Sequence, residues 1–379
     1  MEPMQSLTGR DRKPDDARPG IMGEFDCIHS MDAGRNEGRG HVEPFIPLAK
    51  PDIGPAERAS VQECLDTGFI SHAGRFEGEF ERAFSDRFKT PCAATSSGTG
   101  ALHLALLALG IGAGDEVIVP DLTFGATAAA VLATGATPVA VPIRSETWGI
   151  DPSRLPEAIT PKTRAIIPVH LYGEDAGDFR PFGLPVIEDA CESLGLVPLR
   201  GDITCYSFYA NKIITTGEGG MICGSPEVIE KAKLWRNGGF DEAYSNIVPG
   251  LNYRMTNMQA ALGLAQIGRL DYLLGRRLAN VRSYKRLISG RGKWLFVAKV
   301  KNPRVLAEQL AEHGVQTRPV FTPLNKSPAF SRFADTRKFD FSASDEVWKT
   351  GLCLPTGPHV SPEGIIRIAR ILHGNINVR

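Results

Sequence analysis

"SFYANKIITTGEGG", residues 207–220, sets one lysine between an aromatic segment and a glycine-rich turn. Lys212 follows Phe208 and Tyr209 and lies shortly before a Thr-Thr-Gly-Glu-Gly-Gly run. A lysine in apolar surroundings loses the hydration that favours its charged form, so its amine can become a nucleophile. The alternative is a surface lysine whose apolar stem lies along the protein while its charge stays in water. The stretch alone leaves both interpretations open.

Upstream, "VIEDACESLG" (186–195) places two carboxylates, Glu188 and Asp189, at the end of an apolar strand. A buried strand end rarely carries two acidic residues unless they are exposed or paired. One interpretation is a carboxylate that faces a crevice beside the sheet, and the other is a helix N-cap formed by Asp189. His170 ends another apolar strand in "VHLYG" (169–173), and a histidine at such a position is more often structural than catalytic.

A third segment, "SSGTGALHLAL" (96–106), is a turn of small residues that opens into a helix. The amides of Gly98 and Thr99 would lie at the positive end of the helix dipole, which favours a phosphate, although the same residues are ordinary capping residues. Together, a phosphate cradle, a carboxylate at a strand end and a buried lysine are the groups that a pyridoxal phosphate site needs.

Apolar strands alternate with helical patterns through the middle of the chain, which predicts an α/β fold with a mostly parallel sheet covered on both faces. Ligands of such sheets bind at the carboxyl ends of the strands. The predicted strands are 115–120, 137–143, 164–173, 184–190 and 219–224, and the predicted helices are 55–68, 77–89, 99–112, 125–135, 225–239 and one long helix over 257–288.

The chain is predicted to have three parts. Residues 1–44 are rich in Gly, Asp, Arg and Asn and are expected to form a disordered extension. Residues 45–288 form a large domain with the sheet, and residues 289–379, where the pattern changes, form a smaller C-terminal α+β domain.

Composition excludes several classes of function. The 379 residues carry 43 Lys+Arg and 43 Asp+Glu, so a net charge of zero gives no argument for nucleic acid or an anionic membrane. No apolar run approaches the roughly 20 residues that span a bilayer, and no signal segment is visible, so we expect a cytoplasmic protein. The seven cysteines form no CxxC pair, and no metal site is predicted.

Residues 45–379 resemble the pyridoxal-phosphate-dependent nucleotide-sugar aminotransferases of the DegT family, which have the aspartate-aminotransferase fold, also called PLP fold type I. Seven segments carry the resemblance in the family's order: "GFISHAGRFEGEFERAF", "SSGTGALHLAL", "GDEVIVPDLTFGATAAA", "AIIPVHLYG", "IEDACESLG", "SFYANKIITTGEGGM" and "LNYRMTNMQAALGLAQI".

The resemblance implies a role for each residue that matches a family motif. Lys212 is the lysine that forms the Schiff base and moves the proton, and Asp189 pairs with the pyridine nitrogen of the cofactor. Glu192 lies near its phenolic oxygen, and Phe124 stacks on its ring. The residues implied for the phosphate are Gly98, Thr99, Ser207 and, from a neighbouring subunit, Asn252, which implies a homodimer with shared active sites.

The implied reaction moves an amino group from a donor, expected to be glutamate, through the pyridoxamine form of the cofactor to a 4-keto-6-deoxy nucleotide sugar. The amino-acid sequences of the motifs are most similar to those of the perosamine-forming branch. That branch uses GDP-4-keto-6-deoxymannose and contributes to O-antigen and other polysaccharides. The candidates for sugar contacts are Ser71, His170, Arg318 and His359.

Three alternatives stay open. The substrate can be another keto-sugar nucleotide, UDP- or dTDP-linked and with the keto group at position 3 or 4. A pyridoxal-dependent sugar dehydratase of this family has a histidine in place of the lysine, so Lys212 argues against that reaction. A non-catalytic regulatory homologue would be expected to lose the lysine or the acid, and both are present.

Overall fold

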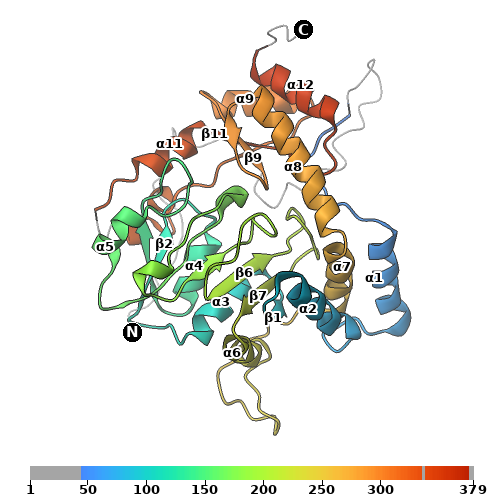
Figure 1. Cartoon of the computed structure of the whole chain (residues 1–379), viewed down its shortest axis with the longest axis vertical. Coiled ribbons are helices and arrows are strands. Elements are labelled where there is room, and N and C mark those ends of the chain that lie inside the picture. Colours follow the sequence, from blue (N-terminus) through green and yellow to red (C-terminus); the bar gives the residue numbers. More distant parts are fainter. Residues whose placement is uncertain (1–43, 335–337, 375–379) are drawn as a thin grey trace, which may run out of the picture. The chain divides into compact units, whose positions relative to one another are not determined.

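The structure is a computed structural model that describes residues 44–334 and 338–374 (Figure 1). The extension predicted over residues 1–44 therefore lies outside the described residues except for Pro44. Within the described ranges, no helix is long and apolar enough to cross a membrane.

A sheet of seven strands forms the centre of the large domain. Its strands pair in two groups, β3-β2-β4 and β5-β6-β7-β1, which two isolated parallel bridges, Ile166–Val186 and Val169–Asp189, join into one order, 3-2-4-5-6-7-1. Strand β7 is antiparallel to both of its neighbours, and the β2–β3, β2–β4 and β5–β6 pairs are parallel. The strands are β1 (Cys92–Thr95), β2 (Glu116–Pro120), β3 (Thr137–Val141), β4 (Thr163–Ile166), β5 (Ile187–Asp189), β6 (Ile203–Ser207) and β7 (Gly220–Gly224).

Helices cover both faces of the sheet, as predicted. Successive side chains of a strand point to opposite faces, and β2 shows the result because Val117 and Val119 belong to one buried cluster while Ile118 belongs to another. Both clusters are apolar, which is why the strands lack a polar face. The helices of the large domain are α1 (Pro55–Thr67), α2 (Arg75–Phe88), α3 (Gly98–Ala108), α4 (Ala126–Ala133), α5 (Leu155–Ala158), α6 (Pro226–Arg236) and α7 (Asn257–Ile267).

Two phenylalanines of α2 that are four residues apart, Phe80 and Phe84, pack against the strand that leads to Lys212. Phe80 and Phe84 are fully buried. The ring of Phe80 lies 5.4 Å from that of Phe208, and the ring of Phe84 lies 5.4 Å from that of Tyr206. Residues four apart lie on the same face of a helix, so these two phenylalanines form a core contact that supports the end of β6.

The prediction of one long helix over 257–288 is wrong, because the chain forms α7 and then α8 (Leu270–Leu287). The junction is held by Arg269, whose guanidinium donates to Glu57 Oε1 and to Asp52 Oδ1, both at 2.7 Å. These partners lie more than 200 residues upstream in the chain. The apolar periodicity of residues 257–288 therefore does not indicate that the helix ends between α7 and α8.

A smaller antiparallel sheet, in the order β10-β11-β9-β8, lies in the part of the chain that was predicted to be a C-terminal domain. Its core joins Phe296 and Leu354 of the sheet to Ile365 and Ile368 of the last helix, and it includes Ile46 from the start of the described chain. The elements that follow α8 are β8 (Gly290–Arg291), β9 (Phe296–Lys299), α9 (Pro303–Glu312), β10 (Arg318–Pro319), η7 (Leu324–Lys326), α10 (Ser331–Ala334), α11 (Ser342–Thr350), β11 (Gly351–Leu354) and α12 (Pro362–Leu372). Three short 3-10 turns lie earlier, between β3 and β5: η4 (Pro152–Arg154), η5 (Leu171–Gly173) and η6 (Arg180–Phe182).

Candidate active site

Lys212 lies in a turn that follows β6, and its amide donates to the carbonyl of Tyr209 at 2.9 Å. Only 13% of its side chain is exposed, and its Nζ lies 3.6 Å from Glu192 Oε1. The same Nζ lies 4.1 Å from the centroid of the Trp294 ring. Of the two interpretations that the sequence left open, the structure therefore favours the buried lysine over the surface one.

Asp189 ends β5, beside β6, and is buried. Its Oδ2 accepts a hydrogen bond from the Thr127 hydroxyl at 2.7 Å, and that hydroxyl is also paired with the Thr123 hydroxyl at 2.9 Å. Its Oδ1 accepts from the Cys191 amide at 3.2 Å. The interpretation of Asp189 as a helix N-cap is wrong, because no helix of the described chain begins between β5 and β6. The carboxylate instead closes a turn at Cys191 and is fixed in direction by Thr127 and, through it, Thr123, which sequence reasoning did not identify.

The start of α3 meets the end of β6 at Gly98. A Cβ atom at this position would lie 2.8 Å from the Ser207 Cβ and 2.9 Å from the Cys191 Sγ, so the approach requires glycine. Ser97 caps the helix by accepting from the Gly100 amide at 3.0 Å. Thr99, at the same helix start, is exposed. The structure therefore brings together the helix N-terminus and the serine that were predicted to bind phosphate.

Glu192 links the lysine to the turn at Tyr172. Its Oε2 accepts from the Tyr172 amide at 2.7 Å, while Oε1 accepts no hydrogen bond from the described residues and faces Lys212. Burial raises the pKa of Glu192, and the charge of Lys212 offsets part of that rise. Tyr172 itself has a φ of 53°, an uncommon backbone conformation for a bulky residue, and such outliers cluster at functional sites.

Three aromatic rings that sequence reasoning missed extend from the lysine to Phe124. Tyr172 stacks on Trp294 at 6.2 Å and on Phe321 at 5.4 Å, and Phe321 contacts Phe124 at 5.4 Å. Phe124 is 45% exposed, so its ring has a free face. Trp294 and Phe321 come from the C-terminal domain, and no local pattern relates them to a lysine in the large domain.

Of the four candidates for sugar contacts, the structure brings Arg318 to this group of residues, with its guanidinium carbon 4.5 Å from the centroid of the Phe321 ring. His170 is fully buried, with Nε2 3.4 Å from Glu188 Oε1 and Nδ1 accepting from the Ala176 amide at 3.2 Å. Both of its nitrogens thus face the protein interior, which is the structural role that the sequence favoured for it.

His359 and Ser71 lie apart from these rings. His359 pairs through Nε2 with the Pro47 carbonyl at 2.8 Å and lines a cavity of about 720 Å³ whose walls include none of the residues predicted to bind the cofactor. Burial lowers the pKa of His359. Ser71 is exposed in the turn between α1 and α2, and its carbonyl accepts from the Asn257 amide.

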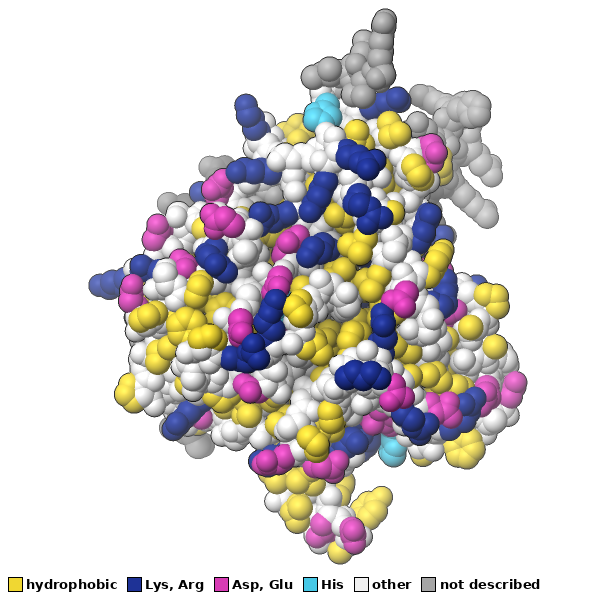
Figure 2. All heavy atoms as spheres, in the orientation of Figure 1, with side chains coloured by type: hydrophobic (Ala, Val, Ile, Leu, Met, Phe, Trp, Pro, Cys, Tyr) yellow, Lys and Arg dark blue, Asp and Glu magenta, His cyan; other side chains and the backbone are white. Residues whose placement is uncertain are grey.

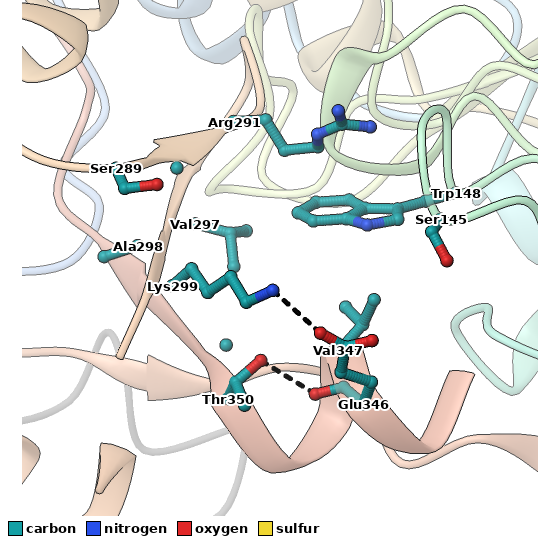
Figure 3. Close-up of a pocket in the computed structure, with 12 residues that line it drawn as sticks. Ser145, Trp148, Ser289, Arg291, Val297, Ala298, Lys299, Glu346, Val347 and Thr350 are labelled. Atoms are coloured by element: carbon teal, nitrogen blue, oxygen red, sulfur yellow. Dashed lines mark hydrogen bonds and ion pairs between the residues drawn. The ribbon is translucent and has the colours of Figure 1, made fainter. Parts of the chain in front are cut away.

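A second cavity of about 250 Å³ lies beside the aromatic group, between the turn after β3 and the C-terminal sheet (Figure 3). Arg291 and Trp148 form one side, with the guanidinium carbon 5.1 Å from the centroid of a Trp148 ring, and the Lys299–Glu346 ion pair forms the other. Trp148 meets Tyr172 edge to face at 5.9 Å, so one wall of this cavity contacts the active-site group.

Comparison with known proteins gives matches along most of the chain. The DegT/DnrJ/EryC1/StrS aminotransferase family model matches residues 51–373. A GDP-perosamine synthase of Caulobacter vibrioides is 38% identical, over 87% of this chain and 98% of its own length. A GDP-perosamine synthase of Vibrio cholerae is 31% identical, over 88% of this chain and 100% of its own length.

Solved structures give the same result for the fold. The Streptococcus pneumoniae protein Spr1654, in its PMP form, superposes with a TM-score of 0.81 at 27% identity, over 87% of this chain and 97% of its own length. DesV of S. venezuelae, in complex with a ketimine intermediate, superposes with a TM-score of 0.80 at 31% identity, over 89% of this chain and 100% of its own length. These matches confirm the predicted fold class.

Proposed function

Because the chain belongs to the DegT/DnrJ/EryC1/StrS aminotransferase family, we propose that it transfers an amino group to a nucleotide-linked 4-keto-6-deoxy sugar, with pyridoxal phosphate as cofactor. The observation that carries the proposal is the buried Lys212, whose Nζ faces Glu192 within reach of a fixed carboxylate and a glycine-started helix. The family and its sugar aminotransferase members support the reaction type.

The residues of the site fit this cofactor. At Gly98 the helix start packs directly against Ser207, so the serine lies beside the helix N-terminus that would bind the phosphate. Glu192 Oε1 is a buried acceptor that faces the lysine and lacks a hydrogen-bond donor among the described residues. Phe124 has an exposed ring face on which a pyridine ring can stack. Pyridoxal phosphate supplies an electron sink and a carrier for the amino group when bound.

Each side chain of the site has a defined task in this proposal. Lys212 holds the cofactor covalently through Nζ and, when released, takes and returns a proton as a general acid and base. Asp189, fixed by Thr127 and the Cys191 amide, keeps a proton on the ring nitrogen by charge pairing. Gly98, Thr99 and Ser207 bind the phosphate at the α3 N-terminus.

For the substrate, we propose GDP-4-keto-6-deoxymannose, with glutamate as donor and GDP-perosamine as product, and hence a place in polysaccharide biosynthesis. The support is the identity of the chain to proteins named GDP-perosamine synthase. The second candidate is a dTDP-linked keto sugar, because a dTDP-3-amino-3,4,6-trideoxy-α-D-glucose transaminase of Streptomyces venezuelae is 33% identical over 86% of this chain and 94% of its own length. Arg318 is the sugar contact that the geometry supports best.

The test is a panel of GDP-, UDP- and dTDP-linked 3- and 4-keto sugars, each incubated with the protein, pyridoxal phosphate and glutamate. Product mass shows whether an amine has replaced the keto oxygen, and NMR shows at which carbon. We expect amination of the GDP-linked 4-keto sugar. Turnover of a dTDP- or UDP-linked sugar alone would refute the substrate, and turnover of none would refute the reaction.

We also propose a homodimer in which Asn252 of one subunit reaches the phosphate in the other. Asn252 is exposed and directly follows the loop of residues 238–250, which extends below α6 (Figures 1 and 2). This loop exposes Phe240, Tyr244 and Ile247, with 84% of Tyr244 exposed, and internal hydrogen bonds such as Ile247 N to Gly239 O at 2.8 Å hold it. Ordered apolar side chains in solvent are typical of an interface.

A further inference from the structure

Trp294 contacts the reactive lysine through two different parts of its indole ring. The Nζ of Lys212 lies 4.1 Å from the ring centroid. The indole Nε1–H donates to the carbonyl of Asn211, the residue before the lysine, at 2.9 Å. One side chain therefore holds the lysine's backbone and also offers its negative ring face to the lysine's amine.

The indole is fixed in this position from several sides. Trp294 is fully buried, its amide donates to the Tyr172 carbonyl at 2.9 Å, and its ring stacks on that of Tyr172 with an interplanar angle of 14°. The guanidinium of Arg277 donates to the Trp294 carbonyl. A ring held this firmly keeps its place when the lysine side chain moves.

The charges around the lysine explain why the ring matters. A buried ammonium group loses hydration and needs a compensating partner. Glu192 Oε1 lies 3.6 Å away, beyond good hydrogen-bond distance, and the hydrogen bond that Glu192 accepts from the Tyr172 amide is made through its other oxygen, Oε2. The guanidinium of Arg318 lies 5.8 Å from the centroid of the Trp294 ring and adds a like charge, while Asp189 adds an opposite one at the end of β5. The ring face is therefore a second group that stabilises the ammonium, in addition to Glu192.

We propose that Trp294 is a positioning residue, which holds the Lys212 ammonium between its ring face and Glu192 whenever the amine is not bonded to the cofactor. This inference rests on the proposed function, because it assigns the resting place of the lysine that the reaction releases. The ring would hold the released amine beside Glu192 and away from the incoming substrate, and the hydrogen bond to Asn211 would keep the turn that carries the lysine fixed to the segment around Trp294.

The test uses the full-length protein without cofactor. Each variant is labelled with acetic anhydride between pH 6 and pH 11, and the modification of Lys212 is followed by peptide mass spectrometry. In W294L the labelling rate at pH 8 should rise about tenfold, because a cation–π contact of a desolvated ammonium is lost. At pH 11, where lysine amines are deprotonated, the rates should converge with that of the wild type, which separates protonation from accessibility.

Two further variants make the result specific. W294F keeps a ring face without the N–H group and should label within about threefold of the wild type at pH 8. W148L is the matched control, because Trp148 is a buried tryptophan that contacts the same Tyr172, while the cation over its ring is Arg291 and not Lys212. It should label like the wild type.

Equal labelling of W294L and W148L at pH 8 would overturn the proposal, as would W294F behaving like W294L. An increase in W294L that persists at pH 11 would also overturn it, because that result reports access alone. Borohydride reduction of the cofactor-loaded wild type is scored separately. A missing covalent link there would refute the proposed function without changing the labelling result.

Discussion

Asp189 and Lys212 show how single residues of this site acquire their properties from neighbours that are distant in sequence. The carboxylate is oriented by the Thr127 hydroxyl, which follows a different strand. The amine is enclosed by Glu192 and by a tryptophan of the C-terminal domain. At this scale the family motifs identify the reacting groups, while their supports come from tertiary contacts.

Replacement of the lysine gives the first prediction. Lys212→Ala should abolish any borohydride-reducible link to pyridoxal phosphate and lower kcat by on the order of 10³-fold or more, because the nucleophile and proton carrier is lost. Mass spectrometry of the reduced protein and a glutamate half-reaction measure the two effects. Lys293→Ala, beside Trp294, is the control and should keep both. A reducible link in Lys212→Ala would show that another lysine carries the cofactor.

The acid and its support give the second prediction. Asp189→Asn should retain cofactor but reduce kcat steeply, because a neutral amide cannot hold the ring nitrogen protonated. Thr127→Val removes a hydrogen bond to a charged group and should reduce kcat by roughly 10- to 100-fold. Thr204→Val, which removes a similar hydroxyl from Glu188, is the control and should leave kcat near the wild-type value. Near-normal turnover of Asp189→Asn would mean that another group pairs with the cofactor.

At the scale of elements, α3 and β6 form the proposed phosphate site, and Gly98 lets the helix start touch the strand end. The sequence predicted the helix and its phosphate site from the small residues 96–100, but it did not predict β1 or β6 as strands. Both are short, and β1 reads as "CAAT", which has no β-branched or aromatic residue before its threonine. β1 becomes a strand by pairing with β7, and β6 becomes one by pairing with β7 on one side and β5 on the other.

The close approach at Gly98 gives the third prediction. Gly98→Ala should weaken cofactor binding by roughly tenfold or more, because the new methyl group would meet Ser207 and Cys191 at under 3 Å and displace the helix start. Fluorescence titration with pyridoxal phosphate measures the affinity. Gly78→Ala in α2, where a Cβ meets nothing within 4 Å, should leave affinity unchanged and stabilise the fold by about 0.5–1 kcal/mol. Equal affinities for both variants would contradict the assignment.

At the scale of the whole molecule, a titratable carboxyl links the large sheet to a segment far along the chain. Asp121, after β2, accepts from the Asn325 amide at 2.8 Å through Oδ1. Burial raises the pKa of Asp121 to about 6, and nearby Asp345 raises it further while Lys326 lowers it. This site could not be found from the sequence, because Asp121 reads as an ordinary turn residue after a strand.

The fourth prediction follows from the sign of that shift. A carboxyl whose folded pKa lies above its unfolded value of about 3.9 stabilises the fold fully below pH 4, and that contribution is lost as pH rises through 6. The unfolding free energy of the wild type should therefore fall, relative to Asp121→Asn, by roughly 2–3 kcal/mol between pH 4 and pH 7. Urea unfolding of the cofactor-free proteins at several pH values measures it. A difference that stays constant with pH would contradict the prediction.

The shared site gives the fifth prediction. Mixed subunits of Lys212→Ala and Asn252→Ala, each expected to be inactive or nearly so, should regain activity, because one site of the hybrid carries neither substitution. The mixture is unfolded, refolded and assayed, and each variant refolded alone is the control. No recovery in hybrids of proven mixed composition would count against an asparagine supplied by the second subunit.

The antiparallel β7 also sets an order on biosynthesis. Among the described strands, β1 pairs with β7 alone, and β7 is made after the lysine, the aspartate and the helix that are proposed to bind the cofactor. A growing chain can therefore contain all the residues of its own subunit that are proposed to bind the cofactor and still lack β7. Without β7, strand β1, which leads into the helix start at Gly98, has no partner in the described sheet. Contacts so distant in sequence form slowly. We expect the growing chain to capture pyridoxal phosphate only after residues 220–224 have been made and have paired with β1, so that nascent chains ending before β7 should carry no cofactor.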